Sequence, residues 1–176
     1  VYATGSFRSD TLFAGSDTLF NSNAVTPDFF IIKLNSSNGS FDWAKSVGEN
    51  GYEYGYGLTT DSNNDIYVTG TYASDSIQFG STWLHTVDQG SSKIFMAKYN
   101  TVGAVLWANG FNGHWGDALA FDIKADASNS IYITGELQGS SLTLGVDSLV
   151  NHSAGSTDVF VAKFDSNGNA IWAKSA

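Results

Sequence analysis

The chain has 176 residues, carries 8 basic and 17 acidic side chains, and has a formal net charge of −9. This charge argues against nucleic acid as a partner, because neutralising phosphates requires a basic surface, and it disfavours an anionic membrane surface for the same reason. Cysteine is absent, which excludes disulfides and thiolate metal sites. No apolar stretch approaches the roughly 20 residues of a membrane-spanning helix, so no membrane insertion is expected.

One sequence pattern is repeated three times at intervals of 65 residues. A fixed period of this length is typical of stacked supersecondary units, each of which buries its apolar faces against its neighbours. The pattern opens with the Tyr-x-Thr-Gly segments at 1–5, 66–70 and 131–135, continues with Phe-x-x-Lys at 30–33, 95–98 and 160–163, and closes with Trp-Ala at 43–44, 107–108 and 172–173.

The second copy is complete and predicts four short antiparallel strands. Residues 66–72 are rich in β-branched and aromatic side chains and follow a polar Asn/Asp turn, which is typical of a strand entered from a tight turn. Four such strands make one blade of a β-propeller. No helix is expected, since no helical period is visible and glycine and asparagine are frequent. The predicted strands are 57–61, 66–72, 93–99 and 104–108, and 119–126 opens the next blade.

The segment 73–92, between the second and third strands, is longer than a minimal blade needs. It carries marks of its own at the repeat interval, so we expect an ordered accessory hairpin at 77–85. This hairpin explains a period longer than the ~40–45 residues of a typical blade. The marks are Gly15, Gly80 and Gly145, and Leu19, Leu84 and Leu149.

The expected fold class is therefore an all-β partial propeller with about 2.75 blades. The first copy lacks its first strand, which gives an incomplete blade at 1–50 and complete blades at 51–113 and 114–176. A closed ring needs about 4–8 blades. The expected partners are thus further blades of the same chain, if the chain is a piece of a longer array, or neighbouring subunits that close a ring.

The repeated motif resembles the bacterial SBBP-type β-propeller repeat over essentially the whole chain. The motif reads Asp-x-x-(Gly/Asn)-x-(Ile/Val)-Tyr-(Ile/Val)-Thr-Gly, then Phe-(Val/Ile/Met)-Ala-Lys, then Trp-Ala-Lys, and the first copy departs from it at Ile32. The resemblance implies a secreted or cell-surface protein, notably of Bacteroidetes, in which such propellers lie beside adhesion modules or a sorting domain. It transfers no catalytic motif. A composition low in charged residues, 14%, also suits an exported protein.

The loops that lead from one blade to the next hold the candidate ligand-binding residues. Segments 48–54 and 112–117 place aromatic rings beside carboxylates and amides, a mixture suited to the faces and hydroxyls of a sugar. The alternative is that these are glycine-rich connections whose aromatics only pack at the rim. The candidates are Tyr52, Glu53, Tyr54, His114, Trp115 and Asp117.

A second candidate lies in the turn before the second strand. Asp61, Asn63 and Asp65 place oxygens at alternating positions, as at the start of a calcium loop. The glycine and the distant bidentate glutamate of the full motif are missing, so the alternative is an Asx turn between strands. No cofactor is expected.

Residues that recur in every copy are interpreted as structural. For the lysines we expect an aliphatic stem that covers a neighbouring blade and an ammonium group paired with an acid. For the tryptophans we expect packing between blades. These residues are Lys33, Lys98 and Lys163, and Trp43, Trp107 and Trp172.

No catalytic constellation is visible in the sequence. The three histidines share no ligand spacing, and there is no nucleophile elbow, phosphate loop or cysteine nucleophile. Glu136 is a lone candidate acid without a partner. The sequence predicts a non-enzymatic structural or interaction module of a larger exported or cell-surface protein. Two alternatives stay open: a carbohydrate-binding propeller that uses the loop aromatics, and part of a hydrolase whose catalytic residues lie outside this chain.

Overall fold

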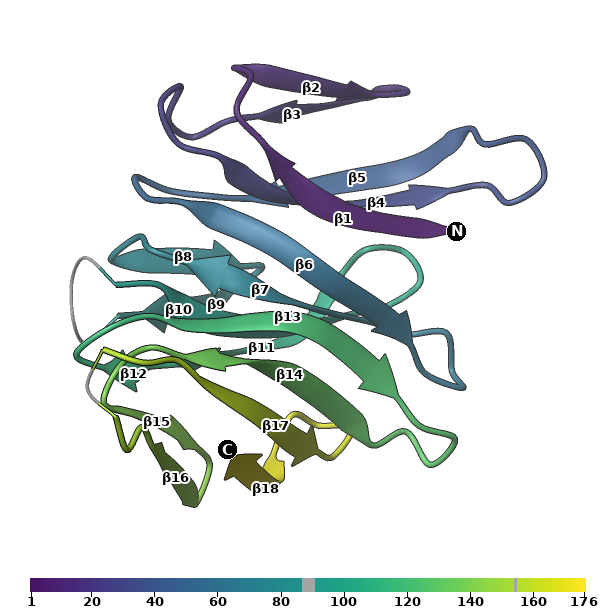
Figure 1. Ribbon diagram of the computed structural model, residues 1–176. Coiled ribbons are helices and arrows are strands. Elements are labelled where there is room, and N and C mark those ends of the chain that lie inside the picture. Colours follow the sequence, from purple (N-terminus) through teal and green to yellow (C-terminus); the bar gives the residue numbers. More distant parts are fainter. Residues whose placement is uncertain (87–90, 154) are drawn as a thin grey trace.

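Three antiparallel sheets follow one another along the chain and lie stacked in a computed structural model that describes residues 1–86, 91–153 and 155–176 (Figure 1). The first sheet has the order β1-β4-β5, the second β11-β10-β7-β6 and the third β13-β14-β17-β18. Their strands are β1 (Tyr2–Phe7), β4 (Asp28–Leu34) and β5 (Phe41–Val47); β6 (Glu53–Thr60), β7 (Ile66–Tyr72), β10 (Lys93–Tyr99) and β11 (Val105–Phe111); and β13 (Ala118–Ala125), β14 (Ile131–Leu137), β17 (Asp158–Phe164) and β18 (Ala170–Ser175).

A two-stranded hairpin accompanies each sheet. It lies between the second and third strands in sequence in the two four-stranded sheets, and between β1 and β4 in the first sheet. The hairpin predicted at 77–85 is confirmed: Ile77 lies opposite Leu84. Residues 87–90 of the expected 73–92 excursion lie outside the described part of the chain. The hairpin strands are β2 (Thr11–Ala14) and β3 (Asp17–Phe20), β8 (Ser76–Phe79) and β9 (Thr82–His85), and β15 (Ser141–Leu144) and β16 (Asp147–Val150); the short β12 (Gly113–His114) adds to β15.

The predicted strands are confirmed, and two of them match to the residue. Strands β7 and β10 span the predicted 66–72 and 93–99, whereas β6 begins four residues before the predicted 57 and β11 runs on to Phe111. All the pairings within the second sheet are antiparallel. The described residues contain no helix, and hence none that could cross a membrane.

Apolar cores fill the space between consecutive sheets. Because the second sheet has a neighbour on both sides, every residue of β7 and β10 is buried, without the alternation of burial seen in a strand with one free face. Strand β17, at the same repeat position in the third sheet, alternates in burial. Val159 is 61% exposed where its repeat counterpart Ile94 is fully buried. Burial of one such side chain stabilises the fold by about 1.5–3 kcal/mol.

A repeated hydrogen bond joins each sheet to the next. The indole Nε1 of Trp43 donates to the carbonyl oxygen of Thr101 at 3.2 Å, and Trp107 Nε1 donates in the same way to Ser166 at 3.3 Å. Gly103 has φ = +79° and lies under the Trp43 ring, where a Cβ atom would be 3.1 Å from ring carbons. The predicted packing of these two tryptophans between blades is thus confirmed.

The hairpins are tied to the outermost strand of their own sheet. Asp17 accepts a hydrogen bond from the backbone amide of Ala44 at 2.9 Å, and Asp147 accepts one from Ala173 at 2.7 Å. These amides lie on β5 and β18, which form the outer edges of the first and third sheets. The carboxylates therefore cap part of an edge that could otherwise pair with another chain.

Candidate functional site

Two clefts occupy equivalent positions where the chain passes from one sheet to the next. The first loop cleft, of about 180 Å³, lies between residues 49–51 and 73–76. The second loop cleft, of about 230 Å³, lies 65 residues further on and is lined by Trp115, Gln138, Gly139, Ser140, Asn151 and Gly155. Both are formed by a connecting loop that lies against the segment after the second strand of the following sheet.

The same backbone contacts frame both clefts. The amide of Ala73 donates to the carbonyl oxygen of Tyr52 at 3.0 Å, and the amide of Gln138 makes the equivalent bond to Asp117 at 2.9 Å. Gly51 and Gly116 occupy one repeat position, and at both a Cβ atom would overlap the facing backbone, that of Ser74 or of Gly139. A common frame therefore carries side chains that differ between the copies.

The side chain of Trp115, in the second loop cleft, is 86% exposed. Its φ of +55° is in the left-handed region that non-glycine residues rarely adopt. The loop is fixed on both sides of it: the amide and hydroxyl of Ser140 donate to the carbonyl oxygen of His114 at 2.8 and 3.1 Å, and Gly139 donates to Asp117. The ring is thus presented on a rigid backbone.

The other candidate residues near Trp115 make contacts within the fold. His114 is exposed on β12 and pairs with Ser141. Asp117 accepts a hydrogen bond from the amide of Ser92. Glu136, the lone candidate acid, accepts a hydrogen bond from the side-chain amide of Gln138 at 2.6 Å. The structure therefore brings His114, Trp115 and Asp117 together on one short loop.

Glu53 lies beneath the first loop cleft and is fully buried. Its carboxylate accepts hydrogen bonds from the Ser74 hydroxyl at 2.5 Å and the Glu49 amide at 3.2 Å. Burial raises the pKa of Glu53 to about 6, although the hydrogen bonds from Ser74 and Glu49 act to lower it. The charge of nearby Asp28 adds to the rise. Burial also raises the pKa of Asp28, which is held by two hydrogen bonds from Ser22. The structure thus places Glu53 at the junction between the first and second sheets, away from solvent.

The Asp61 turn has the geometry of an Asx turn. One carboxylate oxygen accepts from the amides of Asn63 and Asp65 at 2.9 and 3.0 Å, and the other accepts from the Tyr67 hydroxyl at 3.0 Å and Lys98 Nζ at 3.3 Å. Burial opposes ionisation of Asp61, but these bonds prevail and lower its pKa. The Lys98 ammonium therefore supplies the positive charge beside this carboxylate. Among the described residues, no three or more histidine, cysteine or acidic side chains gather as a metal-binding group.

The recurring lysines are paired as predicted in the first two copies. Lys98 Nζ also contacts the Asp65 carboxylate at 3.0 Å. Burial opposes a charged Lys98, but the hydrogen bonds that its ammonium group donates to Tyr67 and Asp65 prevail and raise its pKa. Lys33 contacts Asp42 at 3.6 Å. Lys163 lies 5.1 Å from the ring centroid of Tyr132.

The sequence-based prediction overlooked part of a row of aromatic side chains that begins just before β6 and ends on β13. Tyr52, Tyr54 and Tyr56 stack in succession, with ring centroids 6.4 and 5.9 Å apart, and Phe121 follows at 5.9 Å from Tyr56. These four residues are called the aromatic row below. The sequence does indicate that Tyr56 and Phe121 are equivalent, because they are 65 residues apart. In the structure both lie at β-bulges. Tyr52 and Tyr54 thus belong with this row, not with the loop clefts.

Comparisons with known proteins agree with the repeat architecture. No protein-family model matches the chain. An uncharacterized WD repeat-containing protein of Acanthamoeba polyphaga mimivirus is 28% identical over 175 residues, which covers 82% of this chain. The chain spans only 12% of that relative's length. Together with successive antiparallel sheets of up to four strands, this similarity shows that the chain has an all-β, β-propeller-like fold.

Proposed function

We propose that the chain is a non-enzymatic structural and interaction module of a larger exported or cell-surface protein. The observation that carries this proposal is the pair of loop clefts, in which one backbone frame holds different side chains. Loops on a rigid scaffold are where binding residues concentrate, because they vary without disturbing the core. Asn50 in the first cleft and Trp115 in the second occupy the same repeat position and differ completely in chemistry.

Several finer points belong to the same proposal. The sequence motif supports an SBBP-type repeat with blades at 1–50, 51–113 and 114–176, and the low content of charged residues, 14%, supports export. Further blades, of the same chain or of a neighbouring subunit, are expected to cover the partly exposed face of β17. The WD repeat-containing relative supports a role in binding a protein partner, since repeat propellers offer extended surfaces for this purpose.

An exchange of the two loops tests this proposal. Segments 48–51 and 113–116 have equal length and share glycine at their first and last positions, so each should fit the frame of the other, and the exchange leaves Tyr52 unchanged. A photo-crosslinking residue at position 50 or 115 should capture a surface protein. That protein, once purified, should bind the chain and lose at least tenfold in affinity after loop exchange. Val146, 91% exposed on the third hairpin, is the control position for the crosslinker. Equal capture from position 146, or affinity unchanged by loop exchange, would refute the proposal.

Binding of a carbohydrate is the second candidate function, and Trp115 is the specific observation that favours it. A flat apolar ring lies beside the polar side chains of Gln138, Ser140 and Asn151 in the second loop cleft. Sugar rings present an apolar face and hydroxyls that such groups can bind. The loop that carries Trp115 is held by hydrogen bonds on both sides, which limits the conformational entropy lost on binding.

A glycan array read with two tryptophan variants tests this second function. Trp115→Ala should abolish glycan binding. Trp83→Ala is the matched control, because Trp83 is also an exposed tryptophan, at 46%, but lies on β9. No glycan bound by the unaltered chain, or equal loss with both variants, would reject the carbohydrate function while leaving the protein-binding proposal to the loop exchange.

A further inference from the structure

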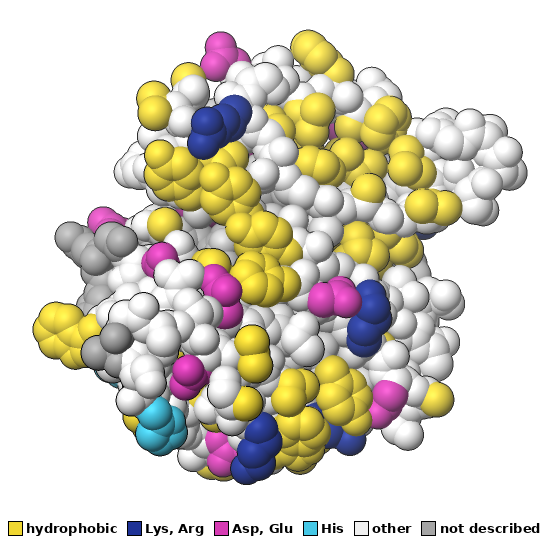
Figure 2. All heavy atoms as spheres, viewed as in Figure 1, with side chains coloured by type: hydrophobic (Ala, Val, Ile, Leu, Met, Phe, Trp, Pro, Cys, Tyr) yellow, Lys and Arg dark blue, Asp and Glu magenta, His cyan; other side chains and the backbone are white. Residues whose placement is uncertain are grey.

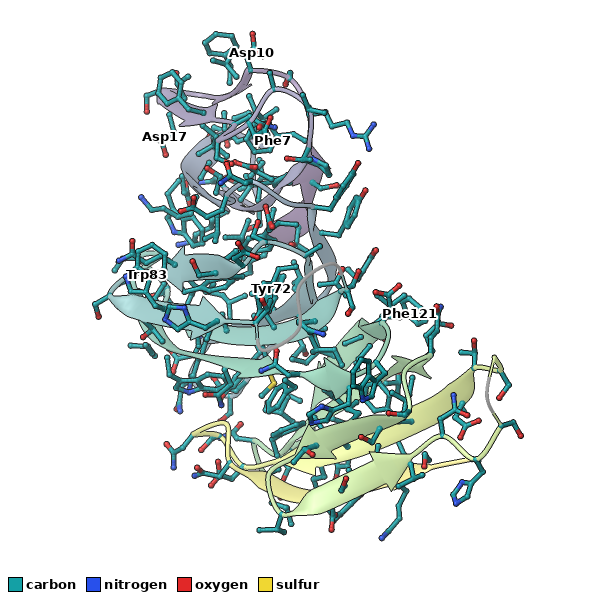
Figure 3. All side chains as sticks on the ribbon, turned by 90° about the vertical axis from the view of Figure 1, so that its left-hand side faces the viewer. Phe7, Asp10, Asp17, Tyr72, Trp83 and Phe121 are labelled. Atoms are coloured by element: carbon teal, nitrogen blue, oxygen red, sulfur yellow. The ribbon has the colours of Figure 1, made fainter. Side chains whose placement is uncertain are left out.

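The aromatic row forms an exposed apolar band on a face separate from the hairpins. Tyr52, Tyr56 and Phe121 are 44%, 43% and 45% exposed. Figure 2 shows hydrophobic side chains gathered in a band across the face over β6 and β13. In Figure 3, Phe121 and Trp83 lie on opposite sides of the stack of sheets. Single exposed aromatics are ordinary, but four in contact mark an interaction surface.

One contact within the chain shows what these rings can bind. The guanidinium carbon of Arg8, the sole arginine of the chain, lies 6.0 Å from the ring centroid of Tyr52. Aromatic faces attract cations through the ring quadrupole, and arginine is the commonest partner. Tyr54, Tyr56 and Phe121 continue the row in the direction away from this arginine.

The charge of the molecule favours a cationic partner on this surface. The net charge is −9. Asp122, next to Phe121, is half-exposed and pairs with Lys124 at 3.2 Å. An acidic molecule attracts a basic ligand over the range of the Debye length, about 8–10 Å at physiological salt.

The spacing of the rings fits an extended peptide. Alternate residues of an extended chain are about 6.6 Å apart. The centroids along the row are 5.9–6.4 Å apart. Successive side chains on one face of an extended segment can therefore reach successive rings.

We propose that the aromatic row is a docking surface for an extended, arginine-containing segment of a partner protein, whose guanidinium groups lie on the exposed rings of Tyr56 and Phe121. This surface is separate from the loop clefts, so it stands or falls independently of the function proposed for them. The partner is attracted by the charge of the molecule and held by the rings.

The test measures binding of a fluorescein-labelled dodecapeptide that alternates arginine and serine, by fluorescence anisotropy against the intact chain. A peptide with citrulline in place of arginine keeps the shape and hydrogen bonds but removes the charge. The arginine peptide should bind, the citrulline peptide should bind at least tenfold more weakly, and affinity should fall as salt rises.

Two pairs of substitutions locate the site at constant net charge. Tyr56→Leu with Phe121→Leu should weaken binding of the arginine peptide about 4- to 25-fold, at about two- to fivefold for each ring. Phe13→Leu with Phe20→Leu is the matched control, since these rings are 72% and 69% exposed on the first hairpin, and it should leave affinity unchanged. Tyr56→Phe keeps the ring and should retain binding, and thermal melts confirm that each variant folds.

Three results would overturn the proposal. The first is no binding of the arginine peptide, and the second is equal affinity for the citrulline peptide, which would indicate apolar docking without a role for charge. The third is an equal effect of the two pairs of substitutions, which would indicate non-specific attraction to an acidic protein.

Discussion

The buried Glu53 should make the chain less stable at neutral pH than in mild acid. Its pKa rises from 4.5 to about 6 on folding, chiefly because burial disfavours the carboxylate. Since the folded state binds the proton more tightly, the stabilisation is complete below pH 4.5 and is lost as the pH rises to about 6. One pKa unit corresponds to about 1.4 kcal/mol, so the loss is about 2 kcal/mol.

Urea unfolding of the chain and of Glu53→Gln, followed by tryptophan fluorescence between pH 4.5 and 7.5, measures this effect. The free energy of unfolding of the unaltered chain should fall by about 2 kcal/mol relative to the variant over that range. Glu136→Gln makes the same chemical change outside the junction and controls for the loss of one charge. A constant difference between the chain and Glu53→Gln, or one that moves in favour of the unaltered chain as the pH rises, would refute the burial argument.

Five substitutions test other contacts by chemical denaturation at pH 7. Lys98→Met leaves the buried Asp61 carboxylate without its cation and should cost about 3–5 kcal/mol, whereas Lys33→Met, at a more exposed pair, should cost less than about 1 kcal/mol; equal costs would contradict the assignment. Trp107→Ala should lower the free energy of unfolding by about 2–3 kcal/mol. Trp107→Phe keeps a ring but loses the hydrogen bond to the next sheet, and should lower it by about 1 kcal/mol. Trp115→Ala should change stability by less than about 0.5 kcal/mol, because the ring is exposed, and a larger loss would assign it a packing role.

The repeat made the strands and hairpins predictable, because the same local signals occur three times. Strand β7 was placed to the residue since its β-branched and aromatic side chains follow a turn of Asn and Asp. The hairpin β8–β9 follows from the length of the segment 73–92 and from the glycine and leucine residues that recur in it at the repeat interval. These signals do not show to which side of the sheet each residue of the preceding loop points.

The positions of Glu53 and of the aromatic row depend on this orientation, which the sequence does not show. Strand β6 begins at Glu53, so alternation turns this carboxylate toward the core and its neighbours Tyr52 and Tyr54 toward solvent. The sequence segment 48–54 gives no sign of where the loop ends and the strand begins. Likewise, the row depends on a β-bulge between Gly55 and Gly57, which changes the direction of Tyr56 and is a matter of pairing rather than of local sequence.

Hydrogen exchange at the five tryptophan indoles, followed by NMR, tests most directly whether the repeats stack as blades. Trp43 and Trp107 donate to the next sheet and should exchange slowly. Trp83 and Trp115 are exposed and should exchange fast. Trp172 should also exchange fast in this chain, because the described residues include no following sheet to accept its hydrogen bond. Exchange of Trp43 and Trp107 as fast as that of Trp83 and Trp115 would contradict the stacked, propeller-like arrangement.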